Sequence, residues 1–211
     1  PVNEASPVNP ANNYLLSKRR AEEVIAAFCN EHDMAYSMVR GTTVYGPRAV
    51  YGSGQMLMAA ANMPIAAAPI NWDFRIPFGH VRDVCGAALH LAKKPVTDGE
   101  DYIVNDDSQL TNVDFFRFVA QITGHLFIPT PPVPIGAVKM VARPLARGLQ
   151  WLSRNVTHSQ SPLEVDTVDY LGLDVVYSNQ KLKDTGYSFV YPDARHGILE
   201  TILWYQKHGW I

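Results

Sequence analysis

The sequence Met34-Ala-Tyr-Ser-Met-Val-Arg40, followed directly by Gly41-Thr-Thr-Val-Tyr-Gly-Pro-Arg48, holds the clearest fold signal of the chain. Residues 34–40 are a short, mainly apolar run between Asp33 and Gly41, which is typical of a β-strand. Residues 41–54 contain four glycines and one proline and predict a loop. We therefore expect a strand that ends in a glycine-rich loop, where open α/β sheets bind ligands.

Helical patterns lie on both sides of this strand. Upstream, apolar residues recur at helical spacing to about Glu31, and Asn12 or Asn13 can cap the helix. Downstream, Asp83 and Thr111 are expected as N-caps and Gly124 as a helix end. The other expected helices span 55–63, 135–152, 179–185 and 194–207, and the other extended segments span 74–81, 101–105 and 173–177. This alternation predicts an α/β fold in which the first helix packs on a parallel sheet containing 34–40 and 101–105.

Composition narrows the class of protein. The chain has 211 residues, 47% of them hydrophobic and 18% charged, with a formal net charge of -2. This composition predicts a globular protein and gives no reason to expect nucleic-acid binding. No apolar run reaches the ~18 residues that span a bilayer. The two cysteines form no CxxC pair and no histidine cluster accompanies them, so no metal site is expected and a cytoplasmic protein with reduced thiols is favoured.

Tyr14-Leu-Leu-Ser-Lys18 is the spacing that carries chemistry. Residues at i and i+4 share one face of a helix. An ammonium near a phenol favours the phenolate, which moves the tyrosine pKa from ~10 toward neutrality. A tyrosine of that kind can exchange a proton with an alcohol or a carbonyl oxygen. An ordinary surface pair has the same spacing, so the motif needs support from the rest of the chain.

Several blocks along the chain give that support. They are Tyr14-xxx-Lys18, Arg40-Gly-Thr-Thr-Val-Tyr-Gly-Pro-Arg48, Gly79-His-Val-Arg-Asp-Val84, Tyr102-Ile-Val-Asn105 and the closing Trp204-Tyr205 with Gly209-Trp210. Together they resemble the extended short-chain dehydrogenase/reductases, the NAD-dependent epimerase/dehydratase family, in which the second to fourth blocks read "RPxxVYGPR", "FVHVDDVA" and "YNV". Their order along the chain is also that of the family.

The resemblance implies a partial Rossmann-like parallel sheet with a smaller α/β substrate-binding lobe. Residues 1–124 would form the Rossmann-like part, with 41–80 contributing to the lobe, and 125–211 would be mainly lobe and closing helix. The family's first GxxGxxG turn, which binds the cofactor pyrophosphate, has no counterpart here. The chain is therefore expected to be the C-terminal portion of a longer enzyme, inactive by itself.

The resemblance also assigns residues. Tyr14 would be the catalytic acid/base, and Lys18 would lower its pKa and hold the nicotinamide ribose of NAD or NADP. Gly41, Thr42 and Thr43 would lie beside the nicotinamide. Arg48 and His80 would bind a small-molecule substrate, although His80 also fits a structural role. Formation of a homodimer is left as an open alternative.

The substrate class follows from departures in two blocks. Nucleotide-sugar enzymes of the family carry Asn where this chain has Thr43, and Arg where it has Ile76. These departures favour the 3β-hydroxysteroid dehydrogenase/dihydroflavonol reductase side of the family, which acts on apolar alcohols and ketones. A nucleotide-sugar epimerase/dehydratase and a non-catalytic remnant or interface fragment are the alternatives. The segment 135–152, apolar with interspersed cations, could cover a pocket, lie on a membrane surface or pack on the core. Core packing is favoured, and membrane association is not expected.

Overall fold

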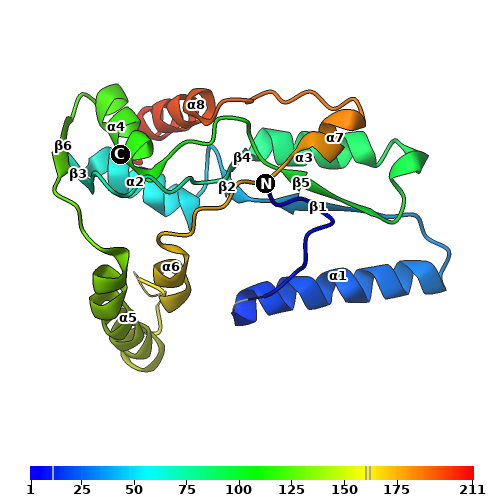
Figure 1. The fold of residues 1–211 in the computed structure, drawn as a ribbon, viewed down its shortest axis with the longest axis horizontal. Coiled ribbons are helices and arrows are strands. Elements are labelled where there is room, and N and C mark those ends of the chain that lie inside the picture. Colours follow the sequence, from blue (N-terminus) through cyan, green and yellow to red (C-terminus); the bar gives the residue numbers. More distant parts are fainter. Residues whose placement is uncertain (11, 160, 162) are drawn as a thin grey trace.

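Three two-stranded parallel sheets follow one another through the computed structural model, which describes residues 1–10, 12–159, 161 and 163–211 (Figure 1). They are β1 (Ser37–Gly41) with β5 (Glu100–Val104), β2 (Thr43–Tyr45) with β4 (Phe78–His80), and β3 (Ile65–Pro69) with β6 (Leu126–Thr130). The expected α/β class with a parallel sheet is confirmed. So is the parallel pairing of 34–40 with 101–105, whose register runs from Ser37↔Glu100 to Gly41↔Val104.

Two expectations about extended segments are wrong. Residues 41–54 are not all loop, because 43–45 form β2, in which Val44 is exposed and Tyr45 is buried. Residues 173–177 form no strand, and only Tyr177 makes an isolated parallel bridge, with Val2. The alternation of β2 was hidden by the glycines around it, which are also typical of turns.

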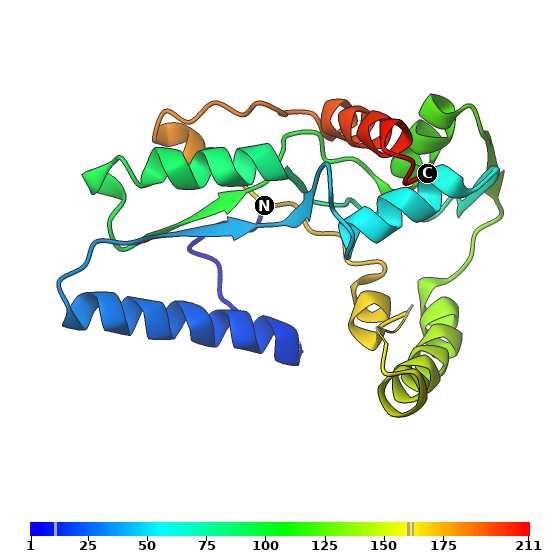
Figure 2. The same cartoon turned by 180° about the vertical axis from the view of Figure 1, so that it is seen from behind.

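Helices cover the sheets on both sides (Figure 1, Figure 2). The expected helices are confirmed within a few residues, with Asn12 and Thr111 as N-caps and Gly124 as the left-handed C-cap. They are α1 (Asn13–Glu31), α2 (Ser53–Asn62), α3 (Val81–Leu91), α4 (Asn112–Thr123), α5 (Ile135–Leu152), α7 (Gln180–Asp184) and α8 (Ala194–Lys207). The short α6 (Val165–Tyr170) and the segments η1 (Pro95–Thr97) and η2 (Ser153–Thr157) were not expected.

Asp83 is not the cap of α3, as was expected. The N-cap is His80, whose Nδ1 accepts a hydrogen bond from the Arg82 backbone N–H at 3.2 Å. Asp83 is buried in the first turn, and its carboxylate accepts hydrogen bonds from the backbone N–H groups of Val190 and Tyr191, at 2.7 and 2.9 Å. Asp83 therefore fastens the C-terminal segment to α3.

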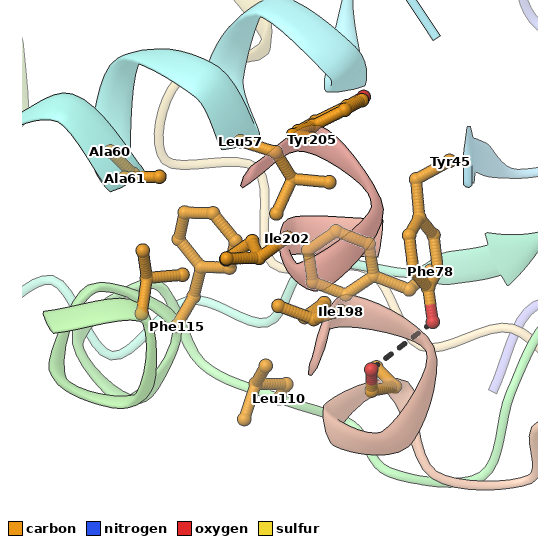
Figure 3. Close-up of a cluster of buried hydrophobic side chains, with 12 residues drawn as sticks. Tyr45, Leu57, Ala60, Ala61, Phe78, Leu110, Phe115, Ile198, Ile202 and Tyr205 are labelled. Carbon is orange, nitrogen blue, oxygen red and sulfur yellow. Dashed lines mark hydrogen bonds between the residues drawn. The ribbon is translucent and has the colours of Figure 1, made fainter. Parts of the chain in front are cut away.

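The larger hydrophobic core lies between α2, α4 and α8 and contacts β2 and β4 (Figure 3). Tyr45 crosses this core, and its hydroxyl donates a hydrogen bond to the Ala194 carbonyl at 3.1 Å. A second cluster joins α3, β1, β5 and α7 around Val104 and Leu182. The division of the chain at residue 124 into a Rossmann-like part and a lobe stays a prediction.

The helix α1 lies along the β1/β5 sheet but contributes little apolar contact to it (Figure 1). Its half-buried side presents Leu15, Glu22 and Ala26. Val24 and Phe28 on the same helix are 68% and 51% exposed. The expected packing of this helix on the sheet therefore consists mainly of polar contacts.

Candidate functional site

Tyr14 and Lys18 lie on one face of the first turn of α1. The Lys18 ammonium is 5.3 Å from the centre of the Tyr14 ring. Asn12 fixes the start of the helix, because its side-chain oxygen accepts a hydrogen bond from the Leu15 backbone N–H at 2.9 Å. Tyr14 is 55% exposed. The pair is thus rigidly attached through its backbone and open to a ligand.

A charge cluster holds α1 in place. Arg40 on β1 donates two hydrogen bonds to the Glu22 carboxylate, both of 2.8 Å, and also pairs with Asp101 on β5. The hydrogen bond from Arg40 lowers the pKa of Glu22, and the hydrogen bond to Glu22 raises the pKa of Arg40. Both groups therefore stay charged near neutral pH, and the helix that carries Tyr14 is tied to both strands.

Two further tyrosines form side-chain hydrogen bonds, one in the turn before α2 and one at the start of α1. The Tyr51 hydroxyl donates a hydrogen bond to Glu164 at 3.0 Å. That hydrogen bond raises the pKa of Tyr51, with smaller contributions from burial, the Glu164 charge and the neighbouring Tyr14. The Asn12 amide donates to the Tyr170 hydroxyl of α6 at 3.4 Å. The start of α1 is therefore linked to α6.

The Gly41–Thr43 loop carries the chain from the first sheet to the second. The Thr42 hydroxyl donates to the Val104 carbonyl and to the Asn105 side-chain oxygen, at 3.3 and 3.2 Å. The Thr43 backbone N–H donates to the Pro77 carbonyl at 2.9 Å. A Cβ on Gly79 would lie 2.9 Å from the Val104 carbonyl oxygen, so only glycine lets β4 approach this loop. The loop lies at the carboxyl end of β1 and β5, where we expected a ligand.

The two expected substrate residues lie in different settings. Arg48 is exposed, with a left-handed φ of 70°, in the turn between β2 and α2. His80 is 1% exposed, caps α3 and packs on the Tyr191 ring at 3.9 Å between centroids. Burial lowers the pKa of His80, so the ring stays neutral at pH 7. The contacts of His80 are those of a structural residue, the second of the two roles considered for it.

A cavity of about 420 Å³ opens between η2 and the start of α6. Its described lining is polar throughout: Gln150, Ser153, Arg154, His158, Ser159, Ser161 and Glu164. Glu164 also accepts the hydrogen bond from Tyr51. One carboxylate thus links this cavity to the turn before α2.

The structure brings together some of the predicted residues and adds others. Tyr14 is paired with Lys18. Gly41 ends β1 and Thr43 begins β2, with Thr42 between the two strands. No hydrogen bond among the described residues joins the pair to these three residues. Tyr51, Glu164 and Asn105 were missed. Tyr51 and Glu164 are 113 residues apart, and no local pattern connects them.

One comparison with known proteins identifies a family. Residues 1–105 match the sequence model of the NAD dependent epimerase/dehydratase family. No curated protein matches the chain in sequence.

Solved structures match over nearly the whole chain. A crystal structure of gox2253 is 27% identical, with a TM-score of 0.69 over 99% of this chain and 61% of the other. UDP-glucose 4-epimerase of Thermotoga maritima with UDP-glucose is 17% identical, with a TM-score of 0.65 over 99% and 58%. UDP-glucose 4-epimerase of Thermus thermophilus in complex with NAD is 18% identical, with a TM-score of 0.63 over 96% and 57%. The chain therefore spans about three-fifths of the length of these proteins.

Proposed function

Residues 1–105 of this chain belong to the NAD-dependent epimerase/dehydratase family, and from that premise we propose that the protein is an NAD(P)-dependent oxidoreductase in which Tyr14 is the acid/base. The observation that carries the proposal is the exposed Tyr14 phenol with the Lys18 ammonium 5.3 Å from its ring. The substrate would be a small molecule with a secondary alcohol or a ketone.

The residues present fit one end of an NAD(P) cofactor. Lys18 makes no ion pair with any described residue, so its ammonium can donate to the ribose hydroxyls. The Gly41–Thr43 loop offers backbone groups at the carboxyl end of β1. When bound, NAD(P) would supply a hydride donor or acceptor. The sequence contains no GxxGxxG turn for the pyrophosphate, so the fit concerns the nicotinamide ribose alone.

The proposed chemistry of the chain is a proton transfer at the substrate oxygen. In the direction of alcohol oxidation, the Tyr14 phenolate oxygen accepts the hydroxyl proton while the substrate becomes a carbonyl compound. In the reverse direction, the Tyr14 hydroxyl returns that proton to the oxygen. Lys18 places its ammonium 5.3 Å from the centre of the Tyr14 ring, on the same face of the helix. The Arg40–Glu22 pair contributes by fixing the helix that holds both residues.

The substrate class divides into two candidates. The sequence departures at Thr43 and Ile76 favour an apolar alcohol or ketone. Arg75 lies one residue before Ile76, the position at which nucleotide-sugar enzymes of the family carry Arg. Its guanidinium donates hydrogen bonds of 2.7 and 2.5 Å to Asp174, so it is not available to a diphosphate. The polar lining of the cavity beside Glu164, with Arg154 and His158, favours a nucleotide sugar instead.

A substrate comparison tests the proposal. The natural protein, meaning the full-length protein that contains this chain, is incubated with NAD+ or NADP+ and either a 3β-hydroxysteroid or UDP-glucose. Formation of NAD(P)H is followed by absorbance. Epimerisation of UDP-glucose, which returns the hydride, is followed separately through the sugar product. We expect turnover with the hydroxysteroid. Turnover of UDP-glucose alone would make the protein a nucleotide-sugar enzyme. Absence of turnover with every alcohol or ketone would favour the alternative that the chain is a non-catalytic remnant or interface fragment.

A further inference from the structure

The helix α5 presents an unpartnered apolar face to solvent. Its exposed large apolar side chains include Met140 at 73%, Val141 at 66% and Trp151 at 65%. Leu145, Leu152 and, in η2, Val156 are exposed as well. We call these six residues the α5 apolar face.

Helical geometry places the five residues on α5 together. At about 100° per residue they fall within an arc of about 140°, and the only side chains of α5 between them are Ala137, Pro144 and Gly148, which are exposed too. Val156 follows in η2, which is a π-helical segment. The side of α5 that contacts α6 lies opposite. There, Ala146 is buried, and Lys139 and Arg143 donate hydrogen bonds to Asp169, at 2.9 and 2.7 Å. The α5 apolar face therefore points away from α6.

The exposed apolar side chains on α1 form a separate region. Along the long axis of the molecule α6 lies between α5 and α1 (Figure 1, Figure 2). Because the α5 apolar face points away from α6, a partner that covered Val24 and Phe28 on α1 would not cover it. The α5 apolar face needs an occupant of its own.

The charge around this face is positive. Arg147 and Arg143 lie along one border of the face, at about 20° and 60° from Met140. Arg154 follows in η2 and is exposed. The sequence has no aspartate or glutamate between Asp114 and Glu164. A second copy of the chain would meet this face with the same arginines and no acidic partner on α5. An anionic surface complements the face in both charge and hydropathy.

We propose that α5 and η2 bind the surface of a membrane that contains anionic phospholipids, with the α5 apolar face among the acyl chains and Arg147 and Arg154 at the phosphate groups. An exposed apolar arc, a cationic border and a tryptophan are typical of helices that lie in the plane of a bilayer. None of the helices in the described part of the chain combines the length and hydropathy needed to cross a membrane. This inference is independent of the proposed enzymatic function.

Sedimentation with lipid vesicles tests the proposal. The 211-residue protein is mixed with vesicles of phosphatidylcholine alone or of phosphatidylcholine with phosphatidylglycerol. We expect binding to the anionic vesicles, at least tenfold weaker binding to the neutral ones, and at least tenfold weaker binding of Leu145→Asp to the anionic vesicles. Arg147→Glu should weaken anionic binding several-fold. These side chains are exposed, and circular dichroism checks that the variants stay folded.

Val24→Asp is the matched control, since Val24 is a similarly exposed apolar residue on α1. It should bind anionic vesicles like the wild type. Trp151 should give a blue-shifted emission on binding, and Trp151→Phe should remove most of that shift.

Absence of vesicle binding would overturn the proposal, as would equal binding by wild type and Leu145→Asp, or loss of binding in Val24→Asp. A dimer in solution that Leu145→Asp converts to a monomer would overturn it as well, because the α5 apolar face would then be an interface between two copies.

Discussion

Arg40 binds Glu22 through two parallel hydrogen bonds, from Nε to Oε1 and from Nη2 to Oε2, each 2.8 Å long. The same guanidinium pairs with Asp101 on the neighbouring strand. The helix that carries Tyr14 and Lys18 is therefore attached to the sheet by charge. This attachment fixes the candidate catalytic pair relative to β1 and to the loop that follows it.

Arg40→Ala should destabilise the protein by about 1–2 kcal/mol, because charge-assisted hydrogen bonds contribute more than neutral ones and these groups are partly buried. The free energy of unfolding in urea measures this. Amide hydrogen exchange should show that α1 gains more mobility than α8.

Arg117→Ala is the control, since Arg117 pairs with Asp114 on one exposed helix surface. Such pairs contribute about 0–1 kcal/mol. Equal losses in the two variants would contradict the role assigned to Arg40.

Asp83→Ala should cost about 2–3 kcal/mol, because the part-buried N–H of Val190 and the buried N–H of Tyr191 would lose their acceptor. Thermal or urea unfolding measures the loss. Asp184→Ala is the comparison, since Asp184 accepts only an exposed hydrogen bond from Gln180. Asp83→Ala with the stability of Asp184→Ala would show that the carboxylate does not anchor the C-terminal segment.

Asp106 should make stability depend on pH. Burial raises the pKa of this carboxyl from its ordinary 3.8 to about 7, and its Oδ2 has no hydrogen-bond partner among the described residues. Between these two pH values the folded state keeps a proton that the unfolded state releases, so the stability contributed by Asp106 falls as pH rises.

Asp106→Asn should therefore match the wild type below pH 3.8, gain on it as pH rises, and exceed it by about 1–3 kcal/mol above about pH 8, since it removes a buried charge whose Oδ2 has no hydrogen-bond partner among the described residues. Urea unfolding across this pH range tests the difference, with Asp107→Asn as the control. A constant difference between Asp106→Asn and wild type would contradict the raised pKa.

The 211-residue chain should bind NADH only weakly, with a Kd above about 1 mM. Contacts to the nicotinamide ribose supply roughly 0.5–1.5 kcal/mol each, which does not offset the cost of association. Isothermal titration measures the affinity. Micromolar binding would reveal a phosphate site outside the residues assigned here.

Local signals predicted much of the fold. Asn12 and Thr111 belong to the residue types that cap helices through a side-chain oxygen, and both do so. His80 caps α3 through a ring nitrogen and does not belong to these residue types. The sequence therefore predicts Asp83, which does belong to them, as the N-cap of α3. The strands β3 and β6 were missed because each is short and ends at or contains a proline, Pro69 and Pro129, which is typical of turns and strand edges.

The site was predictable only where sequence neighbours form it. Tyr14 and Lys18 meet because they are one helical turn apart. Tyr51 and Glu164 meet because the chain folds back over 113 residues, which no periodicity reports. The contact between Thr42 and Asn105 follows from the pairing of Gly41 with Val104, one residue earlier on each strand. These two contacts are therefore set by tertiary structure and could not be predicted from residue spacing in the sequence.

The rate of NAD(P)+ reduction by the natural protein, measured in single turnover for wild type and Tyr14→Phe, tests the central claim most directly. The account predicts a ~10²–10⁴-fold slower reduction in Tyr14→Phe, since the phenol oxygen that exchanges the substrate proton is removed. Tyr36→Phe, a tyrosine whose hydroxyl has no hydrogen-bond partner among the described residues, should react like the wild type. Near-wild-type reduction by Tyr14→Phe would contradict the assignment of Tyr14 as the acid/base.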